Sequence, residues 1–223
     1  MNGYRARLVA SAVVAVAVFA IMGLGYAFDW VWLARLDDWV LAPARRFGEA
    51  HPAWVTAWDV YCTVLGPNAF RLITLIVIVV ALVRRNVRIA MFLLISVELS
   101  GLVTEVAKDL VDRPRPAGAL VAAASSSFPS GHALGVMVAV SALMTVVVPV
   151  VGVAWRGWVI TLGVVIVVTI GAGRVVLNVH HPSDVVAGWA LGYVYFAVCL
   201  LLVPPSRPIT QQDETPAMPG SGR

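Results

Sequence analysis

The chain contains little charge and almost no lysine. Of its 223 residues only 13% are Asp, Glu, Lys or Arg, whereas 60% are hydrophobic. This composition lies outside the usual range of soluble globular domains and predicts a protein that resides in the lipid bilayer. Lys108 is the only lysine among 16 lysine and arginine residues. Because its ammonium is a compact charge with three donors, its position near Arg113 and Arg115 suits binding of an anion such as a phosphate.

Cysteine is equally scarce. Cys62 lies in a polar and aromatic stretch and Cys199 in an apolar run, so their settings do not suggest a disulfide, and neither has the neighbours of a metal site. The net charge of +4 would suit nucleic acid or a membrane surface in a soluble protein, but the arginines here are scattered between apolar runs. They are interpreted as markers of membrane topology, and no nucleic-acid partner is expected.

Six apolar segments have approximately the length needed to cross a bilayer, about 17 to 25 residues. They are expected at 8–28, 68–83, 87–110, 133–153, 158–172 and 184–203. The first follows Arg5 and Arg7, as a secretion signal would, but its apolar stretch is longer than a typical signal core and no clear cleavage site follows it. The predicted fold class is therefore all-α, an integral membrane bundle of six transmembrane helices.

The segment 29–67, between the first two apolar segments, has a different character. It carries both acidic and basic residues and five tryptophans, Trp30, Trp32, Trp39, Trp54 and Trp58. Tryptophan is enriched at the headgroup level, so this external segment is expected to form helices that lie in the membrane interface. It is interpreted either as a collar or as a platform that guides a lipid substrate to a site on the same side.

The C-terminal residues 205–223 are rich in Pro, Gly, Ser, Thr and Gln and show no apolar period. This composition predicts a disordered tail. The expected organisation is one membrane domain over residues 1–204, which includes the interfacial segment, followed by this tail on the cytoplasmic side.

Membrane orientation follows from the short loops, because cytoplasmic loops collect arginine and lysine. With the N-terminus inside, a set of basic residues without nearby acids falls on the cytoplasmic side: Arg5, Arg7, Arg84, Arg85, Arg88 and Arg156. Both termini are therefore expected in the cytoplasm, in a multi-pass protein of the plasma (inner) membrane.

Three separated stretches hold most of the unusual polar residues. They are residues 108–116 after the third apolar segment, Pro-Ser-Gly-His at 129–132 before the fourth, and residues 173–184 between the fifth and sixth. Counting membrane crossings places all three on the external (periplasmic) face. They are expected to build one site.

The residue types of these stretches suit phosphate chemistry. Lys108, Arg115 and Arg174 can neutralise a phosphoryl group and the charge that develops on its oxygens during transfer. Ser130 and Gly131 stand where a helix is expected to begin. The serine hydroxyl, backbone N–H groups and the positive end of the helix dipole can then face the same anion.

Two histidines suggest a division of labour. If His180 donates its Nδ1 proton to Asp184, its Nε2 lone pair is oriented as a nucleophile. His132 can protonate the leaving oxygen and later activate a water molecule. Because three cationic side chains already provide the charge that a magnesium ion would supply, no metal and no other cofactor is expected.

These motifs resemble those of the type 2 phosphatidic acid phosphatase (PAP2) superfamily, which includes membrane lipid phosphatases, glucose-6-phosphatases and soluble vanadium haloperoxidases. The first family motif is matched by Lys108, Arg115 and Pro116, and the second is matched in full at 129–132. The third is matched by Arg174, His180 and Asp184, while Gly173 replaces the family serine. The resemblance implies that His180 is the nucleophile, that His132 is the acid and base, and that five residues bind phosphate: Lys108, Arg115, Ser130, Gly131 and Arg174.

The implied function is metal-independent hydrolysis of a membrane lipid phosphate or diphosphate at the external face, through a phosphohistidine intermediate. A polyprenyl diphosphate is the favoured substrate, followed by phosphatidic acid or phosphatidylglycerophosphate. One alternative is a phosphotransferase, in which another acceptor replaces water. An alternative of a different class is a non-catalytic transporter or lipid-binding subunit that retains the site.

Two acidic residues, Glu98 and Glu105, lie within the third apolar segment. They are seven residues apart and hence on one helix face, which should point to the bundle interior because exposure to lipid is costly. Internal hydrogen bonding is the favoured interpretation, and a proton or substrate pathway is the alternative.

Overall fold

The computed structural model describes residues 2–205. Over this range the chain is all-α, as predicted, and the predicted disordered tail falls almost wholly outside it. The helices are α1 (Asn2–Ala27), α2 (Val31–Ala50), α3 (Pro52–Val64), α4 (Pro67–Val83), α5 (Val87–Leu93), a π-helical segment η1 (Leu94–Glu98), α6 (Ser100–Val111), α7 (Gly131–Val147), α8 (Val153–Val176) and α9 (Pro182–Leu202).

Five helical stretches of the described chain are long and apolar enough to cross a membrane, and α7 is a shorter apolar helix. The five are Gly3–Ala27, Pro52–Val83, Val87–Val111, Val153–Val176 and Pro182–Leu202. The chain is therefore a multi-pass membrane protein. The predicted segment 133–153 is too long, because α7 ends at Val147, close to Pro149, and a proline disfavours helix in the residue before it. The segment 158–172 is too short, because α8 runs from Val153 to Val176.

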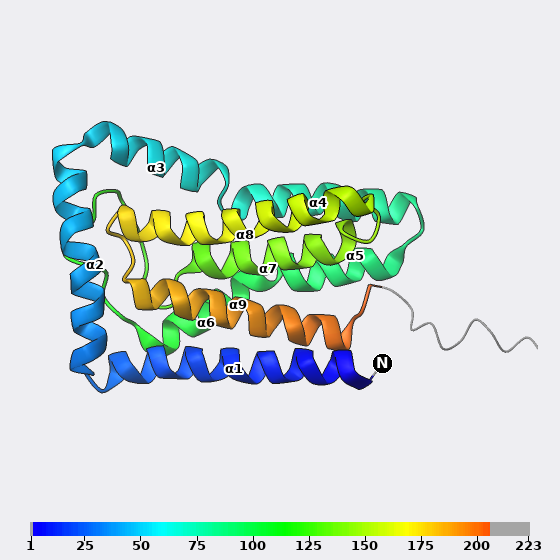
Figure 1. The fold of residues 1–223 in the computed structure, drawn as a ribbon, viewed down its shortest axis with the longest axis horizontal. Coiled ribbons are helices and arrows are strands. Elements are labelled where there is room, and N and C mark those ends of the chain that lie inside the picture. Colours follow the sequence, from blue (N-terminus) through cyan, green and yellow to red (C-terminus); the bar gives the residue numbers. More distant parts are fainter. Residues whose placement is uncertain (1, 206–223) are drawn as a thin grey trace, which may run out of the picture.

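The long helices run side by side, and α2 lies across one end of them (Figure 1). One face of α2 is turned to the bundle, with Leu33, Asp37 and Leu41 buried at intervals of four residues, whereas Trp39 is 74% exposed. This is the pattern of an amphipathic helix. By contrast, α3 runs beside α8 and leads into α4 (Figure 1). Only the α2 part of segment 29–67 therefore lies across the bundle end.

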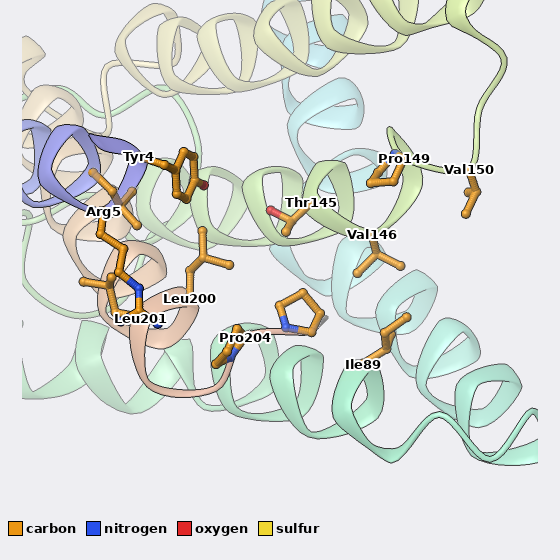
Figure 2. A pocket seen from close by; sticks show the side chains of 12 residues that line it. Tyr4, Arg5, Ile89, Thr145, Val146, Pro149, Val150, Leu200, Leu201 and Pro204 are labelled. Carbon is orange, nitrogen blue, oxygen red and sulfur yellow. The ribbon is translucent and has the colours of Figure 1, made fainter. Parts of the chain in front are cut away.

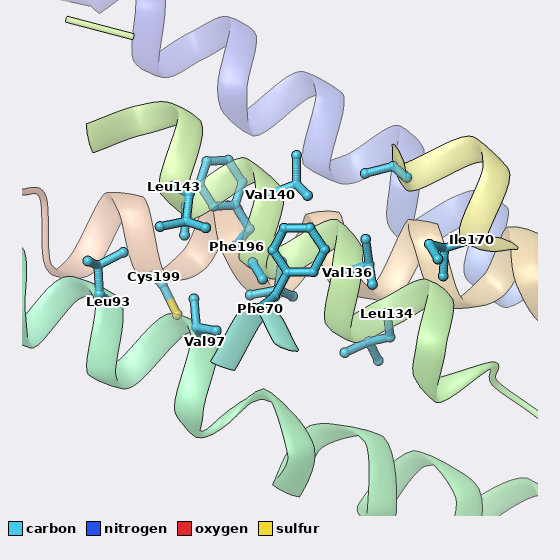
Figure 3. Packing of buried hydrophobic residues seen from close by; sticks show 14 of the residues in the cluster. Phe70, Leu93, Val97, Leu134, Val136, Val140, Leu143, Ile170, Phe196 and Cys199 are labelled. Carbon is cyan, nitrogen blue, oxygen red and sulfur yellow. The ribbon is translucent and has the colours of Figure 1, made fainter. Parts of the chain in front are cut away.

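The centre of the molecule is α7, which packs against α4, α6, α8 and α9. Figure 3 shows its side chains Leu134, Val136 and Val140 among Phe70 of α4 and Phe196 of α9. Between membrane helices such close fit, rather than escape from water, provides the attraction.

Two glycines allow α9 to approach α7 closely. A Cβ atom placed at Gly188 would lie 2.6 Å from the carbonyl oxygen of Ser130, and one at Gly192 would lie 2.8 Å from that of Leu134. This small-residue spacing is typical of close helix pairs in membranes. The approach brings the start of α7 against the start of α9, where the Ser130 N–H donates to the backbone oxygen of Asp184 at 3.0 Å.

Candidate active site

The three polar stretches meet at the end of the bundle that α2 covers. Lys108 lies in the last turn of α6, Ser130 caps α7, and Arg174 lies in the last turn of α8. His180 precedes His181, the N-cap residue of α9. All four side chains are buried. The structure thus assembles residues that are far apart in the sequence into one polar centre.

The His180 imidazole has a defined orientation. Its Nδ1 lies 2.8 Å from the carbonyl oxygen of Ser127, and its Nε2 lies 3.3 Å from Nη1 of Arg115. A carbonyl only accepts and a guanidinium only donates, so Nδ1 carries the proton and Nε2 presents a lone pair. Burial lowers the pKa of His180 to about 4, against the opposing effect of Asp184. The ring is therefore neutral at neutral pH.

The predicted hydrogen bond from His180 to Asp184 is wrong. The Nδ1 atom is 3.8 Å from Oδ2 of Asp184, which is too long for a hydrogen bond. The reason is that the carboxylate of Asp184 already accepts other donors: Nη1 of Arg113 at 2.7 Å, the backbone N–H of His181 at 2.8 Å, and the hydroxyl of Ser127. Besides its direct electrostatic effect on His180, Asp184 accepts a hydrogen bond from the hydroxyl of Ser127, whose carbonyl orients the ring.

A buried ion network ties α2 to this centre. The guanidinium of Arg113 donates to Oδ2 of Asp37 at 2.9 Å and to the hydroxyl of Ser183 at 2.7 Å. Asp37 in turn accepts the N–H of Ser183 at 3.0 Å and its hydroxyl at 2.6 Å. Arg113 therefore bridges the carboxylates of Asp37 and Asp184, and both carboxylates and their cation are buried.

Sequence reasoning missed Asp37, Ser127 and Ser183. For Asp37 a signal was present, since it is a carboxylate four residues from each of Leu33 and Leu41 on the buried face of α2. A charge at such a position requires a buried partner.

Three cations of the site have no carboxylate partner within 4.0 Å in residues 2–205: Lys108, Arg115 and Arg174. Lys108 donates to the hydroxyl of Ser125 at 2.6 Å, and Arg115 donates to the carbonyl oxygens of Val179 at 2.7 Å and Ala124 at 2.8 Å. Burial and the neighbouring Arg174 lower the pKa of Arg115. Three positive charges without a carboxylate partner in one site favour the binding of an anion.

His132 lies within the field of these charges. The cations Arg174, Lys108 and Arg115 all act on it electrostatically, as does His180. His132 is in the first turn of α7, two residues after Ser130. The side chain of Ser130 caps this helix by accepting a hydrogen bond from the Ala133 N–H at 3.5 Å. The structure thus places His132 and the start of α7 at the centre that contains the cations.

Residues 89–208 match the PAP2 superfamily. The chain belongs to the PAP2 superfamily. Over 67 residues it is 42% identical to undecaprenyl-diphosphatase of Sulfolobus acidocaldarius, and this match covers 30% of the chain and 28% of that protein. The fold is similar to the crystal structure of the transmembrane PAP2 type phosphatidylglycerolphosphate phosphatase from Bacillus subtilis, with a TM-score of 0.74 and 23% identity over 85% of this chain and 94% of that one. The family resemblance of the motifs is confirmed.

Gly173 departs from the serine of the PAP2 motif, and the structure gives a reason. A Cβ atom at this position would lie 2.5 Å from Sγ of Cys62 and 2.8 Å from Cε3 of Trp58. Both neighbours belong to α3, which packs against this part of α8. In this member of the superfamily the close approach of α3 takes the space that a serine side chain would need.

A separate hollow lies at the opposite end of the bundle (Figure 2). It encloses about 500 Å³ and is lined mainly by apolar side chains from the start of α1, the end of α7 and the end of α9, including Tyr4, Pro149 and Leu200. None of the PAP2 motif residues contributes to it. The polar centre beneath α2 is therefore the candidate active site.

Proposed function

We propose that this PAP2 superfamily member hydrolyses a membrane lipid phosphate or diphosphate without a metal, through a phosphohistidine formed on His180. One observation carries the proposal: the unprotonated Nε2 of a buried histidine, oriented by the carbonyl of Ser127, lies 3.3 Å from Arg115, one of three site cations without a carboxylate partner in residues 2–205. A neutral imidazole beside an anion site has the properties of a nucleophile toward phosphorus.

The reaction proceeds in two displacements. Lys108, Arg115 and Arg174 bind the phosphoryl oxygens, with Ser130 and Gly131 at the start of α7. Nε2 of His180 attacks phosphorus while the bond to the lipid oxygen breaks. His132, which becomes protonated when the negatively charged substrate phosphate binds beside it, gives this proton to the lipid oxygen. His132 then takes a proton from water, whose oxygen attacks phosphorus. The P–N bond breaks, and the products are phosphate and free His180.

The membrane arrangement belongs to the same proposal. With α7 as a sixth span, both termini lie in the cytoplasm and the active centre lies at the external face. The basic turn between α4 and α5, which carries Arg84 and Arg85, is at the end of the bundle remote from α2 (Figure 1). This arrangement is supported by the tendency of basic residues to gather in cytoplasmic loops.

A polyprenyl diphosphate is the proposed preferred substrate, followed by phosphatidylglycerophosphate and phosphatidic acid. The similarities to an undecaprenyl-diphosphatase and to a phosphatidylglycerolphosphate phosphatase support a choice among lipids with these headgroups. The proposal that the lipid reaches the site within the bilayer fits the exposed apolar side chains of the long helices.

Excess EDTA is expected to leave phosphate release by the purified protein in detergent unchanged to within about twofold, because side chains supply the positive charge. In residues 2–205 no three His, Cys, Asp or Glu side chains are grouped to hold a metal ion. The measurement is the rate of phosphate release from each lipid with and without chelator. Loss of activity that returns on addition of a divalent metal would contradict the metal-free mechanism.

A further inference from the structure

An arginine lies within a membrane-spanning helix close to the candidate active site. Arg71 is in the second turn of α4, inside the apolar stretch Pro52–Val83. Its guanidinium lies against Gly101 of α6, where a Cβ atom would collide with Nη2 and lie 3.4 Å from Cζ. An ionisable residue inside a span is costly and is, by default, a candidate functional group.

The Arg71 guanidinium retains free donor capacity. In residues 2–205 it forms no ion pair within 4.0 Å. The positive charge of Arg71 acts electrostatically on Glu98 of η1. However, Oε1 of Glu98 is buried without a hydrogen-bond partner in the described chain. The two side chains are therefore near each other without forming a closed pair.

Both α4 and α6 place Arg71 farther from the α2 end of the bundle than the catalytic groups. On α6, Gly101 and Lys108 are seven residues apart, hence on one face and about 10 Å apart along the axis. On the α4 side, Gly66 directly precedes the helix, and a Cβ atom placed there would lie 3.5 Å from Cδ2 of His132. The guanidinium is thus farther from the α2 end of the bundle than His132, and in the proposed reaction the lipid part of the substrate extends in this direction.

We propose that Arg71 binds a second phosphate on the lipid side of the phosphate that is cleaved. This inference rests on the proposed function and specifies the substrate class further. With the terminal phosphate held by Lys108, Arg115 and Arg174, and the leaving oxygen at His132, the next phosphate toward the bilayer meets the guanidinium. Its forked donors suit two phosphate oxygens. Lipid diphosphates have this second phosphate directly attached, phosphatidylglycerophosphate has it beyond a glycerol spacer, and phosphatidic acid has none.

The test compares Arg71→Gln with wild type on a polyprenyl diphosphate, phosphatidylglycerophosphate and phosphatidic acid. The fall in kcat/KM for at least one lipid with two phosphates is expected to exceed the fall for phosphatidic acid by roughly tenfold, since charge-assisted hydrogen bonds are lost. The lipid with the larger loss identifies the spacing that fits. Equal falls on all three lipids, or no fall on any, would overturn the inference.

Binding provides a readout that does not depend on turnover. In a His180→Ala background, Arg71→Gln is expected to weaken binding of one of the lipids with two phosphates roughly tenfold more than binding of phosphatidic acid. This result would stand even if wild type released no phosphate, an outcome that would refute only the proposed function. Equal weakening would refute the role of Arg71.

Two further variants separate binding from structure. Arg71→Lys keeps the charge and should retain part of the preference for two phosphates. If Arg71 served only to compensate Glu98, Glu98→Gln would change selectivity in the same way as Arg71→Gln. Arg84→Gln, at the remote turn between α4 and α5, is the matched control for loss of an arginine and should leave the ratio between lipids unchanged.

Discussion

Replacing His180 by alanine is expected to reduce phosphate release by roughly 10⁴-fold or more, as removal of a covalent nucleophile does in other enzymes. The variant lacks the Nε2 lone pair that faces Arg115 at 3.3 Å, while the cations that bind phosphate remain. Substrate binding should therefore persist while turnover is lost. The measurements are kcat/KM on a lipid phosphate and the affinity of the variant for the same lipid.

His51→Ala is the matched control. His51 is exposed at the junction of α2 and α3, and its Nδ1 lies 2.8 Å from the carbonyl oxygen of Phe47, so its loss should leave turnover unchanged. Equal phosphate release by wild type and His180→Ala would exclude His180 as the nucleophile.

The second large effect concerns stability. Arg113→Ala is expected to lower the free energy of unfolding by about 3–5 kcal/mol, because it leaves buried carboxylates without their cation. Asp37 and Asp184 are 1% and 0% exposed, and both are bound by this guanidinium. Turnover should fall as well, since Asp184 holds Ser127 and Ser127 orients His180. Thermal or denaturant unfolding of the purified protein in detergent would measure the loss.

The control for Arg113 is Arg45→Ala, which removes an exposed ion pair. Arg45 lies 2.7 Å from Glu49 one turn away, and both side chains are about half exposed. Such surface pairs contribute about 0–1 kcal/mol. A second variant, Arg113→Ala combined with Asp37→Asn, removes one of the two buried carboxylates left without a cation and should recover part of the stability. A loss for Arg113→Ala no larger than that for Arg45→Ala would contradict the role of the network.

The features that could be predicted from the sequence have strong local signals. Long apolar stretches mark the spans, and the spacing of Lys108, Arg115, His180 and Asp184 marks the family motifs. The partner of His180 could not be predicted, because it is the backbone carbonyl of Ser127, 53 positions away, and a carbonyl has no side-chain signature. The spacing of His180 and Asp184 suggested a direct hydrogen bond, but two of the competing donors to Asp184, Arg113 and Ser127, come from other segments.

The role of the tryptophan-rich segment 29–67 could be predicted only in part from the sequence, for a similar reason. Tryptophan indicates the membrane interface, and α2 lies across the bundle end (Figure 1). The binding of Asp37 to Ser183, 146 positions away, and the packing of Trp58 and Cys62 against Gly173 depend on tertiary contacts. These contacts turn the segment from a simple collar into part of the wall of the site.

If the phosphoryl group passes through His180, it can be trapped there during turnover. Wild-type protein turning over a lipid substrate would be quenched rapidly under alkaline conditions and analysed by peptide mass spectrometry, with His180→Ala treated in parallel. The predicted result is a phosphoryl group on His180 in wild type and none on any residue of the variant. A phosphoryl group on a different residue, or full turnover without one on His180, would contradict the mechanism.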